Sequence, residues 1–318
     1  MRELSAHFRP YRWAISTAEA ARIGRIRPED VLRFDANTAP GPSGAARRAT
    51  LTTALAQVHT YPHGGYPELV ATIASYAHVD PENVVLGAGA DDLILLIART
   101  FAGPGDRVAI VNEPTYPLFR LAAWLAGAEV GDDQPSVTFC CRPHNPTGAI
   151  GEIPGARPLV VDEAYYEYYG QSAALLDEVV VIRTLSKAFA LAGARVGYAL
   201  AGRETARELN ARQAPAPVST LSAALALAVL AEPPDVQPVV EERERLAERL
   251  RELGLDPLPS AANFLYVPLE RAPDVAELLL RRGMVVRDYP DAIRVTVLDR
   301  MSNERLVEAI ARILERRR

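Results

Sequence analysis

The sequence of 318 residues is poor in cysteine, in lysine and in long hydrophobic runs. Its only cysteines, Cys140 and Cys141, are adjacent, which excludes a disulfide framework and indicates a reducing compartment. The longest uncharged apolar run, residues 221–231, has about half the length of a bilayer span and predicts a buried helix instead. Spacing typical of metal ligands is also absent, so the sequence predicts neither a membrane protein nor a metal site.

Positive charge is not in excess, because the sequence has 35 basic and 40 acidic residues and thus a net charge of −5. This balance excludes the electrostatic footprint of a protein that binds nucleic acid or an anionic membrane. Only one of the basic residues, Lys187, is a lysine, so any amine chemistry has a single candidate. Residues 1–13 carry charges and prolines where a secretory signal needs an apolar core, and we expect a cytoplasmic protein.

The rest of the composition is that of a globular protein, with 49% apolar and 24% charged residues. The length predicts one large domain with a smaller companion. Short apolar strands alternate with helical stretches over residues 37–233, which indicates an α/β domain with a mostly parallel central sheet and helices on both faces. The predicted strands are residues 83–86, 107–111, 136–141, 158–162, 179–184 and 197–200.

Two further parts flank this large domain. Residues 1–36 are irregular and rich in arginine, and we interpret them as an N-terminal arm. Prolines near residue 233 precede a charged helix, and helices and strands then alternate over residues 234–318. This part is predicted to be a small α+β C-terminal domain.

Residues with chemical potential follow several predicted strands, at the edge where ligands bind in open α/β sheets. Gly89, Ala90 and Asp91 open a helix and are typical of a phosphate site or of a plain tight turn. Asp162 ends a strand, as a helix cap or a functional carboxylate does. Lys187 stands between apolar stretches, which favours partial burial and a lowered pKa of its amine.

Four motifs occur in a fixed order: N-P-T-G at 145–148, V-V-D-E-A-Y at 160–165, T-L-S-K-A-F at 184–189 and A-R-V-G-Y at 194–198. With this set the chain resembles the fold-type-I aminotransferases that depend on pyridoxal phosphate. It is most similar to their histidinol-phosphate aminotransferase group. The resemblance covers nearly the whole chain, from Phe34-Asp35-Ala36-Asn37 to Ile293-Arg294-Val295-Thr296.

The resemblance implies pyridoxal 5'-phosphate as cofactor and assigns residues to it. Lys187 would bond to the cofactor aldehyde and later move a proton as the base. Asp162 would pair with the pyridine nitrogen, and Asn145 and Tyr165 would donate to the phenolate oxygen. The remaining predicted contacts are Tyr116 on the ring face and, around the phosphate, Gly89, Ala90, Asp91, Ser186 and Arg195.

Substrate and partner contacts are also implied. Arg294, and with it Arg287, would bind a substrate carboxylate or phosphate, and Arg287 alone is equally typical of an exposed surface arginine. Tyr11 and Asn37 match further substrate positions of the family. Tyr61 would reach the cofactor phosphate of a neighbouring subunit in a homodimer, or it is a simple loop aromatic.

The sequence departs from the family in two connections, 131–135 and 149–157, which are too short for the crossover helices expected there. The link from Arg287 to Arg294 is also short, and after Val297 the family's glycine is replaced by Leu298-Asp299-Arg300. Both changes put histidinol phosphate itself in doubt. We therefore expect an aminotransferase that moves an amino group between an amino acid or phosphorylated amine and a 2-oxo acid. A decarboxylase, lyase or oxidase on the same scaffold and a non-catalytic binding protein are the alternatives.

Overall fold

The computed structural model describes residues 7–11, 14–49, 51–62, 65–174 and 176–315. The N-terminal segment 1–13, in which the sequence predicts no secretory signal, lies partly outside the described residues. Residues 63–64, in the loop that follows Tyr61, also lie outside them. Within the described chain, no helix is both long enough and apolar enough to cross a membrane.

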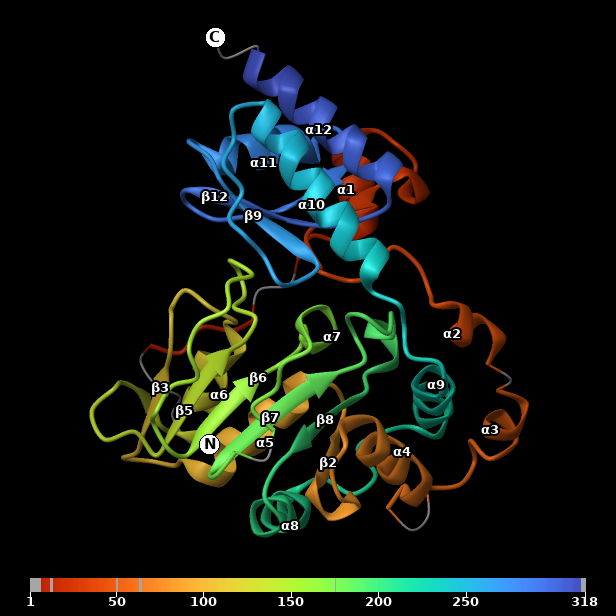
Figure 1. Cartoon of the computed structure of the whole chain (residues 1–318), viewed down its shortest axis with the longest axis vertical. Coiled ribbons are helices and arrows are strands. Elements are labelled where there is room, and N and C mark those ends of the chain that lie inside the picture. The colour runs from red at the N-terminus through yellow and green to blue at the C-terminus, as the bar shows by residue number, and fades with distance from the viewer. Residues whose placement is uncertain (1–6, 12–13, 50, 63–64, 175, 316–318) are drawn as a thin grey trace.

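A seven-stranded sheet forms the centre of the large unit, in the order β2-β8-β7-β6-β5-β3-β4 (Figure 1). Only β8 runs antiparallel to its neighbours β2 and β7, and the other pairs are parallel. The mostly parallel sheet predicted from the sequence is therefore confirmed. The strands are β2 (Val84–Gly87), β3 (Arg107–Ile110), β4 (Glu129–Val130), β5 (Val137–Cys141), β6 (Leu159–Asp162), β7 (Val179–Thr184) and β8 (Gly197–Leu200).

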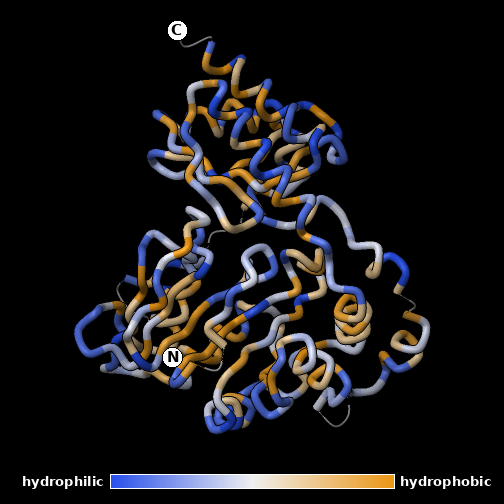
Figure 2. The backbone as a smooth tube through the Cα atoms, viewed as in Figure 1, coloured by the Kyte–Doolittle hydropathy of each residue, from blue (hydrophilic) through white to orange (hydrophobic). Residues whose placement is uncertain are grey.

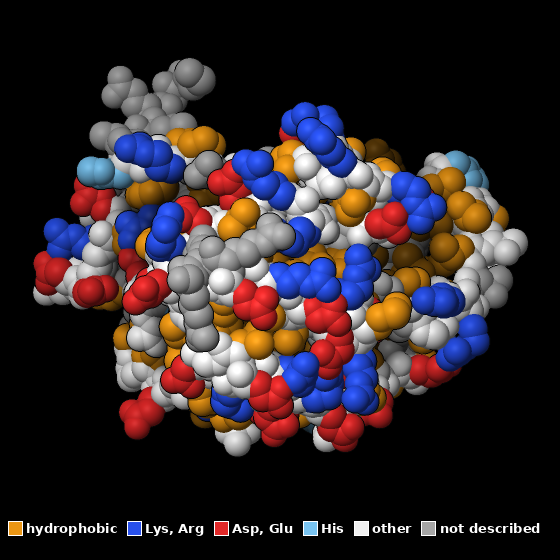
Figure 3. All heavy atoms as spheres, turned by 90° about the horizontal axis from the view of Figure 1, so that it is seen from above, with side chains coloured by type: hydrophobic (Ala, Val, Ile, Leu, Met, Phe, Trp, Pro, Cys, Tyr) orange, Lys and Arg blue, Asp and Glu red, His pale blue; other side chains and the backbone are white. Residues whose placement is uncertain are grey.

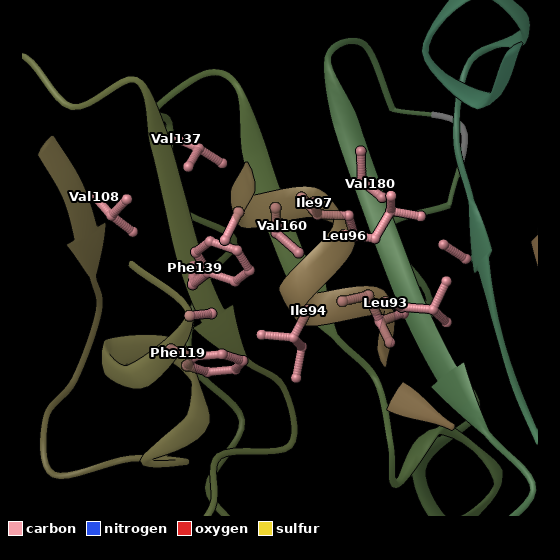
Figure 4. Close-up of a cluster of buried hydrophobic side chains, with 14 of the residues drawn as sticks. Leu93, Ile94, Leu96, Ile97, Val108, Phe119, Val137, Phe139, Val160 and Val180 are labelled. Carbon is pink, nitrogen blue, oxygen red and sulfur yellow. The ribbon is translucent and has the colours of Figure 1, made fainter. Parts of the chain in front are cut away.

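Helices cover both faces of this sheet because its strands are apolar on both sides. One face packs against α5 (Ala90–Phe101), α6 (Leu118–Ala126) and α8 (Arg203–Arg212). Figure 4 shows Leu93 and Ile97 of α5 directed at the side chains of the sheet, with the spacing of one helical face. The other face packs against α4 (Pro67–Ala77) and α9 (Thr220–Ala231).

Short elements complete the large unit. They are α2 (Gly44–Arg48), α3 (Thr52–Ala56), α7 (Tyr166–Tyr169) and the 3-10 turns η2 (Pro81–Asn83) and η3 (Ala192–Ala194). The connections at 131–136 and 142–158 contain neither helix nor strand, which confirms the shortened crossovers predicted from the sequence.

The prediction for the apolar run at 221–231 is wrong in one respect. It forms most of helix α9, but only Ala226, Val229 and Leu230 are buried, and most of its other residues are half-buried. Figure 2 shows the helix as apolar along its length at the outer side of the large unit. A helix that is apolar on all sides is normally buried on all sides. The incomplete burial of α9 therefore leaves an apolar surface exposed on this chain.

The small unit lies above the carboxyl ends of the large sheet (Figure 1). Its antiparallel sheet has the order β11-β12-β9 and is covered by three helices. These elements are β9 (Phe264–Pro268), β11 (Arg287–Asp288), β12 (Ala292–Thr296), α10 (Gln237–Glu252), α11 (Ala272–Leu280) and α12 (Arg300–Glu315). Figure 3 views this unit from above and shows arginines interspersed with acidic side chains. On α10, for example, Arg245 and Glu242 form an ion pair at 2.7 Å.

The N-terminal segment packs on the small unit. Strand β1 (Leu32–Arg33) pairs in parallel with β10 (Met284–Val285), and α1 (Thr17–Gly24) contacts α11. The turn η1 (Pro28–Asp30) connects α1 to β1. The chain therefore enters the large unit from the small one. The division into an arm (1–36), a large domain (37–233) and a small domain (234–318) stays a prediction.

Candidate active site

A cavity of about 640 Å³ lies where the carboxyl ends of β5, β6 and β7 face the small unit. Because parallel strands end at the same edge, it collects side chains from distant parts of the sequence. Most of the predicted site residues line it: Tyr11, Asn37, Ala90, Asp91, Tyr116, Asn145, Asp162, Tyr165, Ser186, Lys187, Arg195, Arg287 and Arg294. Gly89 adjoins this lining, whereas Tyr61 lies outside it and is 84% exposed.

Lys187 follows the end of β7 and is half-buried in the cavity. Its Nζ donates to the backbone oxygen of Ala36 at 3.2 Å and lies 5.8 Å from the centre of the Tyr165 ring. Burial, with the nearby Arg294 guanidinium, lowers the pKa of the amine from 10.5 to about 8. About a tenth of this amine is therefore neutral at pH 7, which is the form that attacks a carbonyl carbon.

Asp162 ends β6 and is 4% exposed. One carboxylate oxygen accepts from the backbone nitrogen of Ala164 at 3.0 Å. Burial raises the pKa of this carboxyl to about 7, because the charged form loses water. A cation placed beside it would restore the charged form, so the site suits a protonated ring nitrogen.

The N-terminus of α5 forms the anion-binding end of the cavity. Gly89 is its N-cap with φ +87° and without a side-chain cap, so the first amides of the helix remain available. A Cβ on Gly89 would lie 2.5 Å from Nη2 of Arg195. Arg195 donates to Asp91 Oδ2 at 2.9 Å, and Ser186 Oγ is buried beside Thr184. Amides, hydroxyls and a guanidinium are the donors that a phosphate needs.

Tyr116 precedes α6 and stands against the anion-binding end. Its hydroxyl donates to Asp91 Oδ1 at 2.8 Å, and its ring meets Phe119 edge-on at 5.9 Å. Burial raises the pKa of the phenol, so it remains neutral. The ring is thus held between a polar and an apolar anchor, as a stacking residue must be.

Arg294 on β12 joins the small unit to the large one. It is 7% exposed, donates through Nη1 to Asn145 Oδ1 and through Nη2 to the backbone oxygen of Asp35 at 2.7 Å. Its Nε is buried and has no partner among the described residues. Because a guanidinium only donates, it engages the oxygen of Asn145 and leaves the amide N–H₂ group for another acceptor.

Arg287 on β11 pairs directly with Arg294 across the two antiparallel strands. Like charges in opposing positions repel each other. Arg287 is exposed and forms no ion pair with the described residues. An anion between the two guanidiniums would relieve this repulsion.

Several lining residues are not predicted from the sequence, and one group of them forms a stripe on α6. Pro117, Arg120, Leu121 and Trp124 face the cavity from the start and inner face of α6. Their spacing of three and four residues is that of one helical face and could have identified them. It carries no chemical signature, because the same spacing is typical of core helices.

Comparisons with known proteins support the same chemistry. The family model described as aminotransferase class I and II matches residues 29–132 and 128–310. A histidinol-phosphate aminotransferase from Caldanaerobacter subterraneus subsp. tengcongensis is 33% identical over 81% of this chain and 85% of that protein. One from Staphylococcus haemolyticus is 30% identical over 85% of this chain and 87% of its own length.

The fold is also that of solved structures. The histidinol-phosphate aminotransferase of Sinorhizobium meliloti, in complex with pyridoxal-5'-phosphate, superposes with a TM-score of 0.85 at 23% identity. The match covers 98% of this chain and 99% of that chain.

Proposed function

The chain belongs to the class I and II aminotransferases, and from this premise we propose that it takes the amino group of a phosphorylated amine similar to histidinol phosphate and transfers it to a 2-oxo acid. As a member of this family it is an enzyme that depends on pyridoxal phosphate. When bound, this cofactor supplies a ring that accepts electrons from the reacting carbon. The observation that carries the proposal is the single lysine amine in a cavity that is also lined by the paired arginines Arg287 and Arg294.

The residues present fit the cofactor. Asp162 is a buried carboxylate in need of a cation, and the ring nitrogen provides one. The cradle of Gly89 and Arg195 leaves no room for a Cβ but offers donors to a phosphate. Ser186 and the amides of Ala90 and Asp91 add to this set. Asn145 and Tyr165 keep donors for the phenolate oxygen, and Tyr116 borders the ring position.

Lys187 is the base in this proposal. Its lowered pKa provides neutral amine at working pH, and Asp162 and Arg294 line the same cavity and both affect that pKa. It therefore holds or moves a proton at the substrate carbon that bears the amino group.

Arg294 and Arg287 bind the substrate anions in this proposal. The buried Arg294, with its unpartnered Nε, suits a fixed group, and the exposed Arg287 suits the distal phosphate. Tyr11 lines the same cavity, is 43% exposed and is proposed to contact this phosphate.

A comparison of two amines tests the substrate. The cofactor-loaded protein is mixed with histidinol phosphate or with histidinol, which lacks the phosphate, and the loss of cofactor absorbance is followed. We expect kcat/KM for histidinol to be lower by roughly 100-fold, because a charge-assisted pair is lost.

Arg287→Gln should reduce this preference, whereas Arg281→Gln, an exposed arginine paired with Glu277, should leave it unchanged. Equal rates for the two amines contradict the phosphate assignment. Release of carbon dioxide in place of a keto product contradicts amino transfer.

We further propose a homodimer in which Tyr61 reaches the partner's cavity. Leu55 and Val58 are more than half exposed beside it, and α9 is incompletely covered. An apolar surface of this kind is typical of a subunit contact. The two buried free cysteines favour a reducing compartment, and we propose the cytoplasm.

Mixing two inactive variants tests the shared site. Lys187→Ala and Tyr61→Ala protomers are unfolded together and refolded. With random pairing about half of the dimers are hybrids, and each hybrid holds one intact site of two. About a quarter of the wild-type activity should therefore return. No recovery above the separate variants contradicts the shared site.

A further inference from the structure

Asn37 is held by the small unit on three sides. It is 1% exposed, and its backbone nitrogen donates to Thr296 Oγ1 at 2.9 Å. The proton of the same hydroxyl is shared between the backbone oxygen of Phe34 at 2.8 Å and the side-chain oxygen of Asn37 at 3.1 Å. The backbone oxygen of Asn37 accepts from Asn263 Nδ2 at 3.1 Å. Asn37 is therefore fixed relative to β12 and to the residue that precedes β9.

The remaining polar group of Asn37 contacts the large unit. Its Nδ2 donates to the hydroxyl of Tyr165 at 2.9 Å. Tyr165 is 3% exposed, and burial raises the pKa of its phenol, so the hydroxyl keeps its proton at neutral pH. Within the described chain the hydroxyl has no hydrogen-bond acceptor for that proton. A hydroxyl has one proton to give, and Asn37 already uses its acceptor side.

We propose that Asn37 is a positioning residue for the Tyr165 hydroxyl. Its amide N–H donates to the lone pair of the phenol oxygen, so the phenol's own proton points into the cavity. There it would be donated to the phenolate oxygen of the cofactor. This inference rests on the proposed cofactor site. It gives Asn37 a role that differs from the substrate contact that the family resemblance implies.

The same strand links this device to the substrate. Arg294 and Thr296 lie two residues apart on β12 and share a face of the strand. Arg294 faces the proposed substrate anion, and Thr296 holds Asn37. A shift of β12 would therefore be transmitted to the direction of the Tyr165 hydroxyl.

The pH midpoint of the visible absorbance change of the bound cofactor reports this hydrogen bond. A hydrogen bond donated to the phenolate oxygen stabilises the deprotonated cofactor, so its loss raises the midpoint. The other charged or titratable groups that face Tyr165 are Lys187 after β7, Arg294 on β12, Cys141 on β5 and Asp162 on β6. None of the variants below alters them.

The experiment titrates the cofactor-loaded protein without substrate. Tyr165→Phe should raise the midpoint, and Asn37→Ala should raise it by roughly 0.5 to 1 pH unit, the effect of one neutral hydrogen bond. The double variant should match Tyr165→Phe alone, because Asn37 acts only through the phenol. Asn37→Asp keeps the side-chain size and should also raise the midpoint, since a carboxylate takes the phenol's proton for itself.

Thr38→Ala is the matched control, because Thr38 lines the same cavity and its side chain forms no hydrogen bond with the described residues. Its midpoint should equal that of the unaltered protein. An unchanged or lower midpoint in Asn37→Ala overturns the inference, and a fall would mean that the phenol donates to Asn37. If Asn37→Ala fails to fold, an unchanged midpoint in Asn37→Asp has the same meaning. The proposed cofactor site fails separately, if the unaltered protein gains no absorbance band with pyridoxal phosphate.

Discussion

The cofactor-free protein should become more stable at neutral pH when Lys187 is replaced by methionine. The pKa of Lys187 falls from its usual 10.5 to about 8, and each pKa unit corresponds to about 1.4 kcal/mol. Burial of this charge therefore costs about 3 to 4 kcal/mol below pH 8. Lys187→Met removes that cost but also the hydrogen bond to Ala36, which contributes about 1 kcal/mol. We expect a net gain of about 2 kcal/mol at pH 7.

The sign of this effect changes with pH. Below pH 8 the amine is charged in both the folded and the unfolded chain, and the whole cost is present. As the pH rises from 8 to 10.5, the folded protein releases its proton first, so the cost disappears. Above this range the wild type keeps only its hydrogen bond, and the variant should be slightly less stable.

Urea unfolding of the cofactor-free proteins at several pH values measures the difference. Groups that do not interact with Lys187 affect the wild type and the variant equally. Asp162 is an exception, because Lys187 lowers its pKa, so the comparison is made above pH 8 as well as at pH 7. Arg287→Met is the control, because an arginine stays protonated throughout and its replacement should give a difference that is independent of pH. A Lys187→Met variant that is no more stable than the wild type at pH 7, or a difference that does not change with pH, refutes the reasoning.

Three other substitutions have expected outcomes. Asp162→Asn should slow amino transfer at least roughly 100-fold in stopped-flow measurements. The cofactor's ring nitrogen loses its buried carboxylate partner, which raises the activation free energy by about 3 kcal/mol or more. A rate within tenfold of the wild type would contradict the pairing. Gly89→Ala should weaken cofactor binding roughly tenfold or more in a fluorescence titration, since a Cβ at φ +87° meets Arg195; unchanged affinity would show that the phosphate binds elsewhere. Phe119→Ala, fully buried and stacked on Phe139 at 5.2 Å, should lower the free energy of unfolding by about 3 to 5 kcal/mol, and a loss below about 1 kcal/mol would mean that the core closes around the gap.

Local patterns predicted the elements that carry the site. Strand β7 has the predicted bounds, 179–184, and helix α5 begins at Ala90, where the sequence predicts that a helix opens. In α5 the glycine before the first residue and the apolar stripe both mark the helix. In β7 four β-branched residues, 179–182, mark the strand, which ends at Thr184. Because strands of a parallel sheet end at one edge, the residues after them had to meet, and Asp162 and Lys187 line one cavity.

Contacts between distant segments could not be predicted in this way. The pairing of β1 with β10 and the bonds of Asn37 to Thr296 join residues about 250 positions apart, and no local period encodes them. The error on α9 has a related cause. Its composition shows that the helix avoids water, but it does not show whether the same chain or a second copy covers it.

The shortened connections show why the site tolerates the loss of two crossover helices. Those helices would cover a face of the sheet, whereas the site residues project from its edge. In the second connection Arg142 Nε donates to the backbone oxygen of Gly151 at 3.0 Å, and its guanidinium lies over the ring of Tyr169 at 5.1 Å. This holds the loop against the sheet, where Ile153 packs on the core that contains Cys140. A pinned loop thus replaces a helix as the cover of β5 and β6, and the ends of these strands keep the geometry that the chemistry needs.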